Sequence, residues 1–95
     1  MKMLEKELEQ KLVKAIKAKG GLCLKLTSPS MSGLPDRLCL LPDGKIGFVE
    51  LKAPGKKPRP LQLKRHEQLR HLGFLVFVLD EETKIGGVID AIQST

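Results

Sequence analysis

A few residues near the middle of the chain combine the side-chain types needed for metal and proton chemistry. Asp36 is followed, after thirteen residues, by Glu50-Leu51-Lys52. Residues two apart on a β-strand point to the same side of a sheet, so Glu50 and Lys52 would present a carboxylate and an ammonium group side by side. Whether Asp36 joins them depends on how its own strand pairs with theirs.

The turn between these two strands decides the position of Asp36. Pro42-Asp43-Gly44 is typical of a type I turn closed by a glycine bulge. A three-residue loop of this kind places Asp36 directly opposite Glu50, with their Cβ atoms about 5 Å apart. A two-residue Asp-Gly loop would instead pair Asp36 with Leu51 and turn it to the other face. The Pro-Asp-Gly sequence favours the first register.

Two carboxylates at that distance repel each other unless a cation lies between them. Oxygen donors suit Mg²⁺ or Mn²⁺ rather than zinc. Such an ion can polarise a phosphodiester and lower the pKa of a bound water. Lys52 could orient or deprotonate that water, or neutralise the charge that develops at phosphorus. The alternative is a surface hairpin with an ordinary Glu–Lys pair, because Glu-x-Lys by itself is a common sequence.

The elements around these residues predict an α/β protein with a mixed β-sheet and helices on its faces. An amphipathic helix over 3–19 is indicated by apolar residues at every fourth position: Leu4, Leu8, Leu12 and Ile16. Strands are predicted over 22–27, 36–41, 46–53 and 74–79, and further helices over 61–72, with apolar positions 61, 69 and 72, and over about 82–92. The order is α-β-β-β-α-β-α, and the length of 95 residues predicts a single domain over 1–95.

Positive charge is concentrated in one segment. Between Lys52 and His71 there are seven Lys or Arg residues and one acidic residue, so this segment accounts for the whole net charge of +6. Such a concentration indicates a polyanionic partner, although a solvated basic face would look the same. The candidate phosphate contacts are Lys25, Lys56, Lys57, Arg59, Lys64 and Arg65. The lack of Trp and Tyr argues against reading single strands by base stacking.

The remaining composition points to a cytoplasmic protein. Cys23 and Cys39 lack the spacing of a zinc or redox motif and lie in apolar runs, so buried free thiols are expected. The charged, periodic N-terminus does not resemble a signal peptide. No apolar run approaches the roughly 20 residues that a membrane-spanning helix needs.

Several motifs together resemble the VRR-NUC family, a branch of the PD-(D/E)XK nucleases. They are Gly33-Leu34-Pro35-Asp36-Arg37, Phe48-Val49-Glu50-Leu51-Lys52, Pro60-Leu61-Gln62 and Leu72-Gly73-Phe74, and the resemblance extends from about Glu5 to Asp80. Members occur as small phage or bacterial proteins and as the C-terminal module of a eukaryotic interstrand-crosslink repair nuclease. The resemblance implies a restriction-endonuclease-like core and cleavage that depends on Mg²⁺, with Mn²⁺ able to substitute.

The resemblance also implies roles for individual residues. Asp36 and Glu50 would be metal ligands, the backbone carbonyl of Leu51 would be a further ligand, and Lys52 would be the catalytic lysine. Gln62 stands at the family's glutamine position, where it would hold water or the metal shell. An ordinary polar residue in the first turn of a helix is the alternative for Gln62.

The family carries a glutamate in its first helix, and Glu5 and Glu9 are the candidates here. Both lie on or beside the apolar stripe of the predicted helix, whereas Glu7 faces away. A carboxylate on a core-facing side costs free energy unless it has a partner, and a metal cluster would supply one. Glu5 lies fifteen residues before Gly20, which matches the family, so it is the preferred ligand.

Two features leave assembly and proton chemistry open. His66 and His71 lie on the basic helix outside any matching motif, so contact with solvent or phosphate is expected. The apolar stripe of the tail, Ile85, Val88, Ile89 and Ile92, would either complete the core of the monomer or form a dimer surface. The resemblance implies a homodimer that acts on branched DNA, Holliday junctions above all, because two symmetric nicks need two sites related by a two-fold axis.

Two other classes of function compete with a nuclease. A non-catalytic nucleic-acid-binding module would keep the fold without the activity, and the intact set of Asp36, Glu50 and Lys52 argues against it. A basic protein-interaction adaptor would show neither metal dependence nor salt-sensitive DNA binding.

Overall fold

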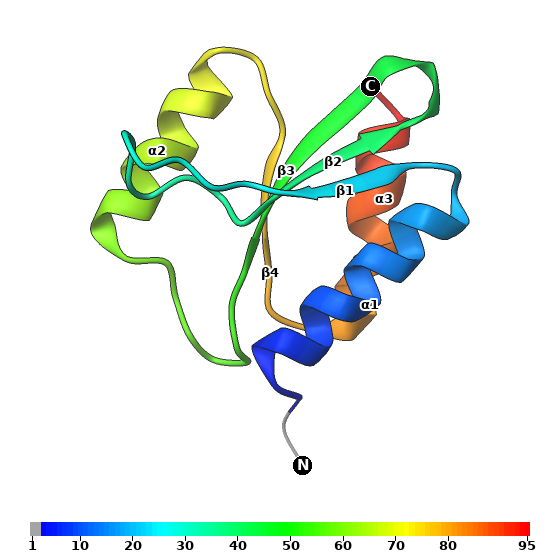
Figure 1. Ribbon diagram of the computed structural model, residues 1–95, viewed down its shortest axis with the longest axis horizontal. Helices are drawn as coiled ribbons and strands as arrows, with labels where there is room; N and C mark the ends of the chain where they lie inside the picture. Colours follow the sequence, from blue (N-terminus) through cyan, green and yellow to red (C-terminus); the bar gives the residue numbers. More distant parts are fainter. Residues whose placement is uncertain (1–2) are drawn as a thin grey trace.

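A four-stranded mixed β-sheet with helices on both faces forms the protein (Figure 1). The computed structural model describes residues 3–95. Its elements are α1 (Glu5–Ala18), β1 (Leu22–Lys25), β2 (Arg37–Leu41), β3 (Lys45–Leu51), α2 (Pro60–His71), β4 (Val76–Leu79) and α3 (Ile85–Gln93), with short 3₁₀ turns at Pro42–Gly44 and Glu82–Lys84. This order confirms the predicted α/β class and the sequence of elements.

The strands lie in the order β1-β2-β3-β4. β1, β2 and β3 are antiparallel neighbours, whereas β3 and β4 are parallel. A parallel pair needs a crossover connection, and α2 supplies it on the face of the sheet opposite α1 and α3 (Figure 1). β3 is therefore covered by helices on both faces, and side chains that alternate along it enter two different environments.

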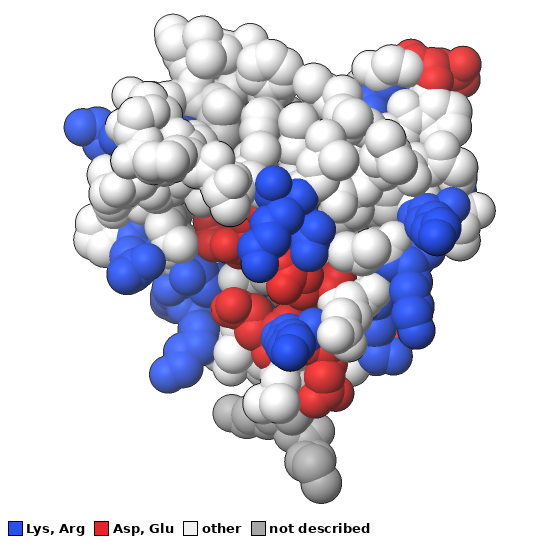
Figure 2. Space-filling model, in the orientation of Figure 1, with Lys and Arg blue, Asp and Glu red and all other residues white. Residues whose placement is uncertain are grey.

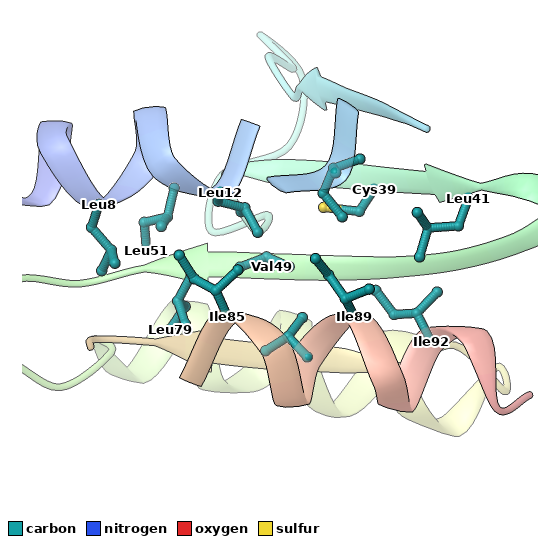
Figure 3. Packing of buried hydrophobic residues seen from close by; sticks show 12 residues of the cluster. Leu8, Leu12, Cys39, Leu41, Val49, Leu51, Leu79, Ile85, Ile89 and Ile92 are labelled. Atoms are coloured by element: carbon teal, nitrogen blue, oxygen red, sulfur yellow. The ribbon is translucent and has the colours of Figure 1, made fainter. Parts of the chain in front are cut away.

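The hydrophobic core lies between the sheet and the pair α1 and α3 (Figure 3). The predicted stripe of α1 is confirmed for Leu8, Leu12 and Ile16, which are all buried, but not for Leu4, which precedes the helix and is exposed. α3 packs closely on β3 at Gly47, where an added Cβ would lie 2.7 Å from the side chain of Ile92.

The tail stripe belongs to this core as well. Ile85, Val88, Ile89 and Ile92 are all buried against the sheet. The stripe therefore completes the core of the monomer and leaves no apolar surface on α3 for a second copy.

The β2–β3 hairpin has the predicted register. Leu41 pairs with Lys45, which places Asp36, one residue before β2, opposite Glu50. The predicted type I turn is wrong, because Asp43 has a φ of 69° instead of the negative value that such a turn requires. Aspartate tolerates the left-handed region better than most residues, so the loop keeps its three-residue length with a different path.

β1 and β3 end two residues earlier than predicted, whereas β2 and β4 end at the predicted residues. β3 stops at Leu51, although the Lys52 N–H still donates to the carbonyl of Leu79 at 3.0 Å. Pro54 explains this end, because proline has no N–H for the ladder and also restricts the residue before it. Lys52 therefore lies just beyond the end of β3 and not within the sheet.

Within residues 3–95, every helix is too short or too polar to cross a bilayer.

Candidate active site

The chemistry-bearing residues gather on the α2 face of the sheet, where β2 begins and β3 ends. Side chains of β3 alternate, so Val49 and Leu51 enter the core while Glu50 points to the opposite face. Asp36 stands opposite Glu50, and Lys52 follows two residues later on the same side.

Asp36 is fixed by backbone contacts on both sides. Its Oδ2 accepts a hydrogen bond from the Leu51 N–H at 2.7 Å, and its carbonyl oxygen accepts one from the Leu26 N–H at 2.9 Å. The Leu51 bond engages one carboxylate oxygen and ties Asp36 to the strand that carries Glu50. Asp36 therefore holds its place through the antiparallel register itself.

The loop before Asp36 is clamped against α2. Gly33 has a φ of 84°, and an added Cβ would lie 2.9 Å from Cγ of Leu61. Arg65 Nε donates to the carbonyl of Ser32 at 2.9 Å. The Gly33 of the motif is thus required both for its left-handed backbone and for its close approach to the helix.

Glu50 is the buried centre of the site, with 1% of its surface exposed. Gln62 Nε2 donates to Oε2 at 3.1 Å, and the His66 Nε2 lies 3.2 Å from Oε1. Lys52 Nζ lies 4.0 Å from Oε2. Each oxygen of the carboxylate therefore has one polar partner on α2, and the ammonium group of Lys52 stands nearby.

Burial raises the pKa of Glu50 to about 8. Hydrogen bonding to Asp36 and the negative charges of Asp36 and Glu5 also raise this pKa, and the positive charge of Lys52 opposes them. A proton or another cation is therefore needed to relieve the repulsion among these carboxylates at neutral pH.

The donor set fits a hard divalent cation. Asp36 and Glu50 supply carboxylate oxygens, and the Leu51 carbonyl, which follows in the chain, could supply another. Within residues 3–95 no three His, Cys, Asp or Glu side chains are grouped closely enough to hold a metal ion. Mg²⁺ usually keeps several waters and needs only one or two carboxylates, so this sparse set of ligands suits it.

The two glutamates of α1 have different surroundings. Glu9 Oε2 accepts a hydrogen bond from Arg37 Nε at 2.9 Å, and Arg37 Nη1 donates to the Cys23 carbonyl at 3.1 Å. Glu9 is thus engaged on the α1 side of the sheet. Glu5 is exposed and close enough for its charge to raise the pKa of Glu50, so it is the better placed of the two. Its role as a metal ligand stays a prediction.

The expectation for His66 is wrong, because His66 is completely buried and contacts Glu50 instead of solvent or phosphate. His71 is exposed, as expected. Burial, with the positive charges of Arg70 and Lys52, lowers the pKa of His66, so its ring is neutral. The 3.2 Å contact between His66 and Glu50 is therefore a hydrogen bond that involves a neutral ring, and not an ion pair.

A signal for His66 was present in the sequence. Gln62 and His66 are four residues apart, which places them on one face of a helix. The apolar positions do not form such a face, since Leu61 and Leu72 are exposed and Leu69 is half-buried. α2 turns its polar face inward because it covers a polar site, and a search for apolar periodicity cannot detect that.

Most of the candidate phosphate contacts are exposed at the surface. The exposed ones are Lys25 on β1, Lys56, Lys57 and Arg59 before α2, and Lys64 on α2. Arg65 is half-buried, and its guanidinium bonds Ser32 and Gln68. Figure 2 shows acidic side chains in the lower middle of one face of the molecule, with Lys and Arg both among them and on either side.

The two cysteines are closer than their sequence positions indicate. Cys23 and Cys39 are directly opposite each other on β1 and β2, with their Sγ atoms 3.8 Å apart. Both are free thiols, as expected. Cys39 is buried, but Cys23 is only half-buried because β1 is the edge strand.

Comparison with known proteins places this site in context. No family model matches the chain. A protein of Acyrthosiphon pisum secondary endosymbiont phage 1, described as "Putative nuclease p44", is 50% identical over 89 residues, which are 94% of this chain and 95% of the phage protein. A solved structure described as "VRR_NUC domain" superposes with a TM-score of 0.84 at 38% identity and covers 90% of this chain and 94% of its own.

Proposed function

Because this chain belongs to the VRR-NUC family of nucleases, we propose that it is a metal-dependent DNA endonuclease whose site is formed by Asp36, Glu50 and Lys52. The observation that carries the proposal is the buried Glu50, which lies among the negative charges of Asp36 and Glu5. These carboxylates repel one another unless a proton or another cation relieves the repulsion, and a carboxyl group with so perturbed a pKa argues for a function.

Asp36, Glu50 and the Leu51 carbonyl would hold Mg²⁺, for which Mn²⁺ can substitute, and Glu5 would complete the carboxylate set. When bound, the ion supplies Lewis-acid polarisation of the phosphodiester and a lowered pKa of water. Lys52 orients the attacking water and neutralises the charge that develops on the phosphate. Gln62 holds Glu50 in place.

Exposed basic side chains would hold the DNA across this site. Lys56, Lys57 and Arg59 precede α2, and Lys64 lies within it. Lys25 on the edge strand β1 is exposed as well, but its register with Arg37 directs it to the α1 side of the sheet, so it would contact phosphate only around the sheet edge. The distribution of charge in Figure 2 suits a polyanion whose backbone crosses the acidic centre, since phosphates contact the flanks while one of them meets the cation.

The proposed substrate is branched DNA, four-way junctions above all, cut by a homodimer in the cytoplasm of a bacterium or a phage-infected cell. The α2 face of β1 offers a surface for the second copy, because Leu22 is 62% and Leu24 43% exposed. They pair with Leu40 and Leu38 of β2, which are half-buried on the same face. Contact between two copies of this apolar surface would give the two-fold symmetry that paired nicks require.

One assay tests the nuclease proposal. The protein is incubated with plasmid, linear duplex and a four-way junction in Mg²⁺, Mn²⁺ or EDTA, beside Lys52→Ala. We expect cleavage with either ion, none in EDTA or with Lys52→Ala, and the highest rate on the junction. Binding without cleavage by the wild-type protein would favour a non-catalytic nucleic-acid-binding module. Equal rates on linear duplex would refute only the preference for branched DNA.

Light scattering at micromolar concentration tests the assembly. We expect a dimer for the wild-type protein and a monomer for Leu24→Lys, because a charge in an apolar interface is costly to bury. A wild-type monomer would remove the argument for paired nicks.

A further inference from the structure

We propose that His66 is a positioning residue that acts together with Gln62 to hold the Glu50 carboxylate in the orientation a divalent cation needs. This inference rests on the proposed function, since it assigns a role within the same site. It adds a residue that lies outside the sequence motifs and makes no contact with solvent.

The surroundings of His66 leave it one polar partner. Its Nε2 lies 3.2 Å from Glu50 Oε1, while its Nδ1 is buried without any partner in the described part of the chain. A neutral imidazole has one donor nitrogen and one acceptor nitrogen. A proton on Nδ1 would leave a buried N–H unpaired and turn a lone pair toward the carboxylate. For the ionised carboxylate that a cation needs, the proton therefore lies on Nε2, and His66 donates to Glu50 Oε1.

Gln62 has an equally fixed orientation. Its Oε1 accepts a hydrogen bond from the Arg59 N–H at 2.8 Å, so its Nε2 is the atom that donates to Glu50 Oε2. That bond belongs to the N-terminus of α2, where it satisfies a backbone group that has no partner within the helix. The start of the helix thus sets the direction in which Gln62 donates.

Gln62 and His66 together form a clamp on the Glu50 carboxylate. They are one helical turn apart on α2, and each engages a different oxygen of the same carboxylate. A carboxylate has about four lone-pair sites, so two hydrogen bonds leave the others available for a cation. The clamp fixes the plane of the carboxylate before any ion arrives.

If His66 served only to fill the core, a histidine would be a costly choice of residue at this position. An apolar residue of similar volume would fill the same space without an unpartnered Nδ1. Outer hydrogen bonds of this kind orient metal ligands, and their loss typically weakens metal affinity by about 10–100-fold. His66 is therefore better explained by the position of Glu50 than by the stability of the core.

Metal-induced stabilisation gives a measurement that does not depend on cleavage. The shift in melting temperature is followed as Mg²⁺ or Mn²⁺ is titrated into wild-type protein, His66→Phe, His66→Met and His66→Gln. Phe and Met fill the space without a donor, whereas Gln restores one. His71→Phe is the matched control, because His71 is exposed on the same helix.

We expect metal affinity to fall by about 10–100-fold in His66→Phe and His66→Met. His66→Gln should recover part of it, and His71→Phe should equal the wild type. In cleavage assays at limiting metal, kcat should fall while KM for DNA stays constant. Two substitutions without a donor keep the test valid if one of them fails to fold.

Two results would overturn the proposal. The first is wild-type metal affinity in a folded His66→Phe or His66→Met protein. The second is a His66→Gln protein no better than His66→Met. A wild-type protein that neither binds metal nor cuts DNA would overturn the proposed function as well, whereas normal wild-type binding with unaffected variants would overturn this inference alone.

Discussion

The two faces of the β-sheet follow opposite rules. The face toward α1 and α3 is closed and apolar apart from the half-buried Arg37–Glu9 pair, with Leu12 and Val49 among its fully buried side chains. The face toward α2 buries Glu50, Gln62 and His66. Burial of apolar side chains on the first face stabilises the fold. Burial of Glu50 on the second face destabilises the fold whenever this carboxylate is ionised. The difference shows that α2 is positioned for chemistry more than for stability.

A core substitution should have the largest effect on stability. Leu12→Ala removes a fully buried side chain from the apolar face and should lower the free energy of unfolding by about 2–5 kcal/mol. Urea denaturation measures this. Cleavage per folded molecule should change little, because Leu12 is remote from the α2 face. A loss below about 1 kcal/mol would mean that the apolar face is not the main source of stability.

A catalytic substitution should show the opposite pattern. Lys52→Ala should reduce cleavage by at least about 10²-fold, since it removes a group that acts on the transition state. Asp36→Ala and Glu50→Ala should do the same, while DNA affinity survives through the phosphate contacts. Lys84→Ala is the control, because Lys84 is exposed and bonds Asp80 away from the site. Full activity of Lys52→Ala in single-turnover assays would contradict the mechanism.

The stability of the metal-free protein should depend on pH through Glu50. Its pKa is about 8 in the folded state and 4.5 in the reference state, so between these values the folded protein binds a proton that the unfolded chain releases. Stability should therefore fall as the pH rises from about 4.5 to about 8.

Glu50→Gln should remove this dependence and stabilise the metal-free protein at neutral pH, although it abolishes cleavage. Added Mg²⁺ should stabilise the wild type more at pH 8 than at pH 5. Thermal melts across this range provide the measurement. A Glu50→Gln protein that is less stable than the wild type at pH 8 would show that burial of the ionised Glu50 carboxylate does not destabilise the fold.

The loop that places Asp36 should be sensitive to one methyl group. Gly33→Ala adds a Cβ that would lie 2.9 Å from Leu61 Cγ at a left-handed φ, and we expect it to cost about 1–3 kcal/mol and to reduce cleavage. Gly55→Ala is a matched control, because Gly55 has a φ of 82° but no atom within 4 Å of the added Cβ. Equal effects of the two substitutions on cleavage would show that contact with α2 does not position Asp36.

The apolar face was predictable from the sequence, and the polar face only in part. Regular spacing gave Leu8, Leu12 and Ile16, because a helix that covers a core repeats its apolar residues with its own period. The register of Asp36 and Glu50 followed from the length of the hairpin loop. The left-handed Asp43 was missed, because several backbone paths close a loop of the same length.

His66 was missed for a different reason. Gln62 and His66 share one face of α2, but the spacing alone does not show that this face is buried, because the partner of His66 is Glu50, sixteen residues earlier. The contact between the two thiols arises in the same way, from strand pairing. Residues that serve a site are fixed by their partners across the fold, and a sequence shows those partners only once the register of each element is known.

The smallest expected effect concerns the exposed basic surface. Charge reversal at Lys56, Lys57 and Lys64 should weaken DNA binding and flatten its dependence on salt, by about 0.9 in the log–log slope for each duplex phosphate contact that is lost. Arg65 is unsuitable for this test, because its bond to Ser32 holds the Asp36 loop. Lys84→Glu serves as the control for charge alone. Because each contact adds little by itself, only the slope across several salt concentrations separates phosphate binding from a solvated face. An unchanged slope would show that these lysines serve solubility and do not contact phosphates. The α2 face would then carry catalytic residues, and other residues would have to bind the DNA.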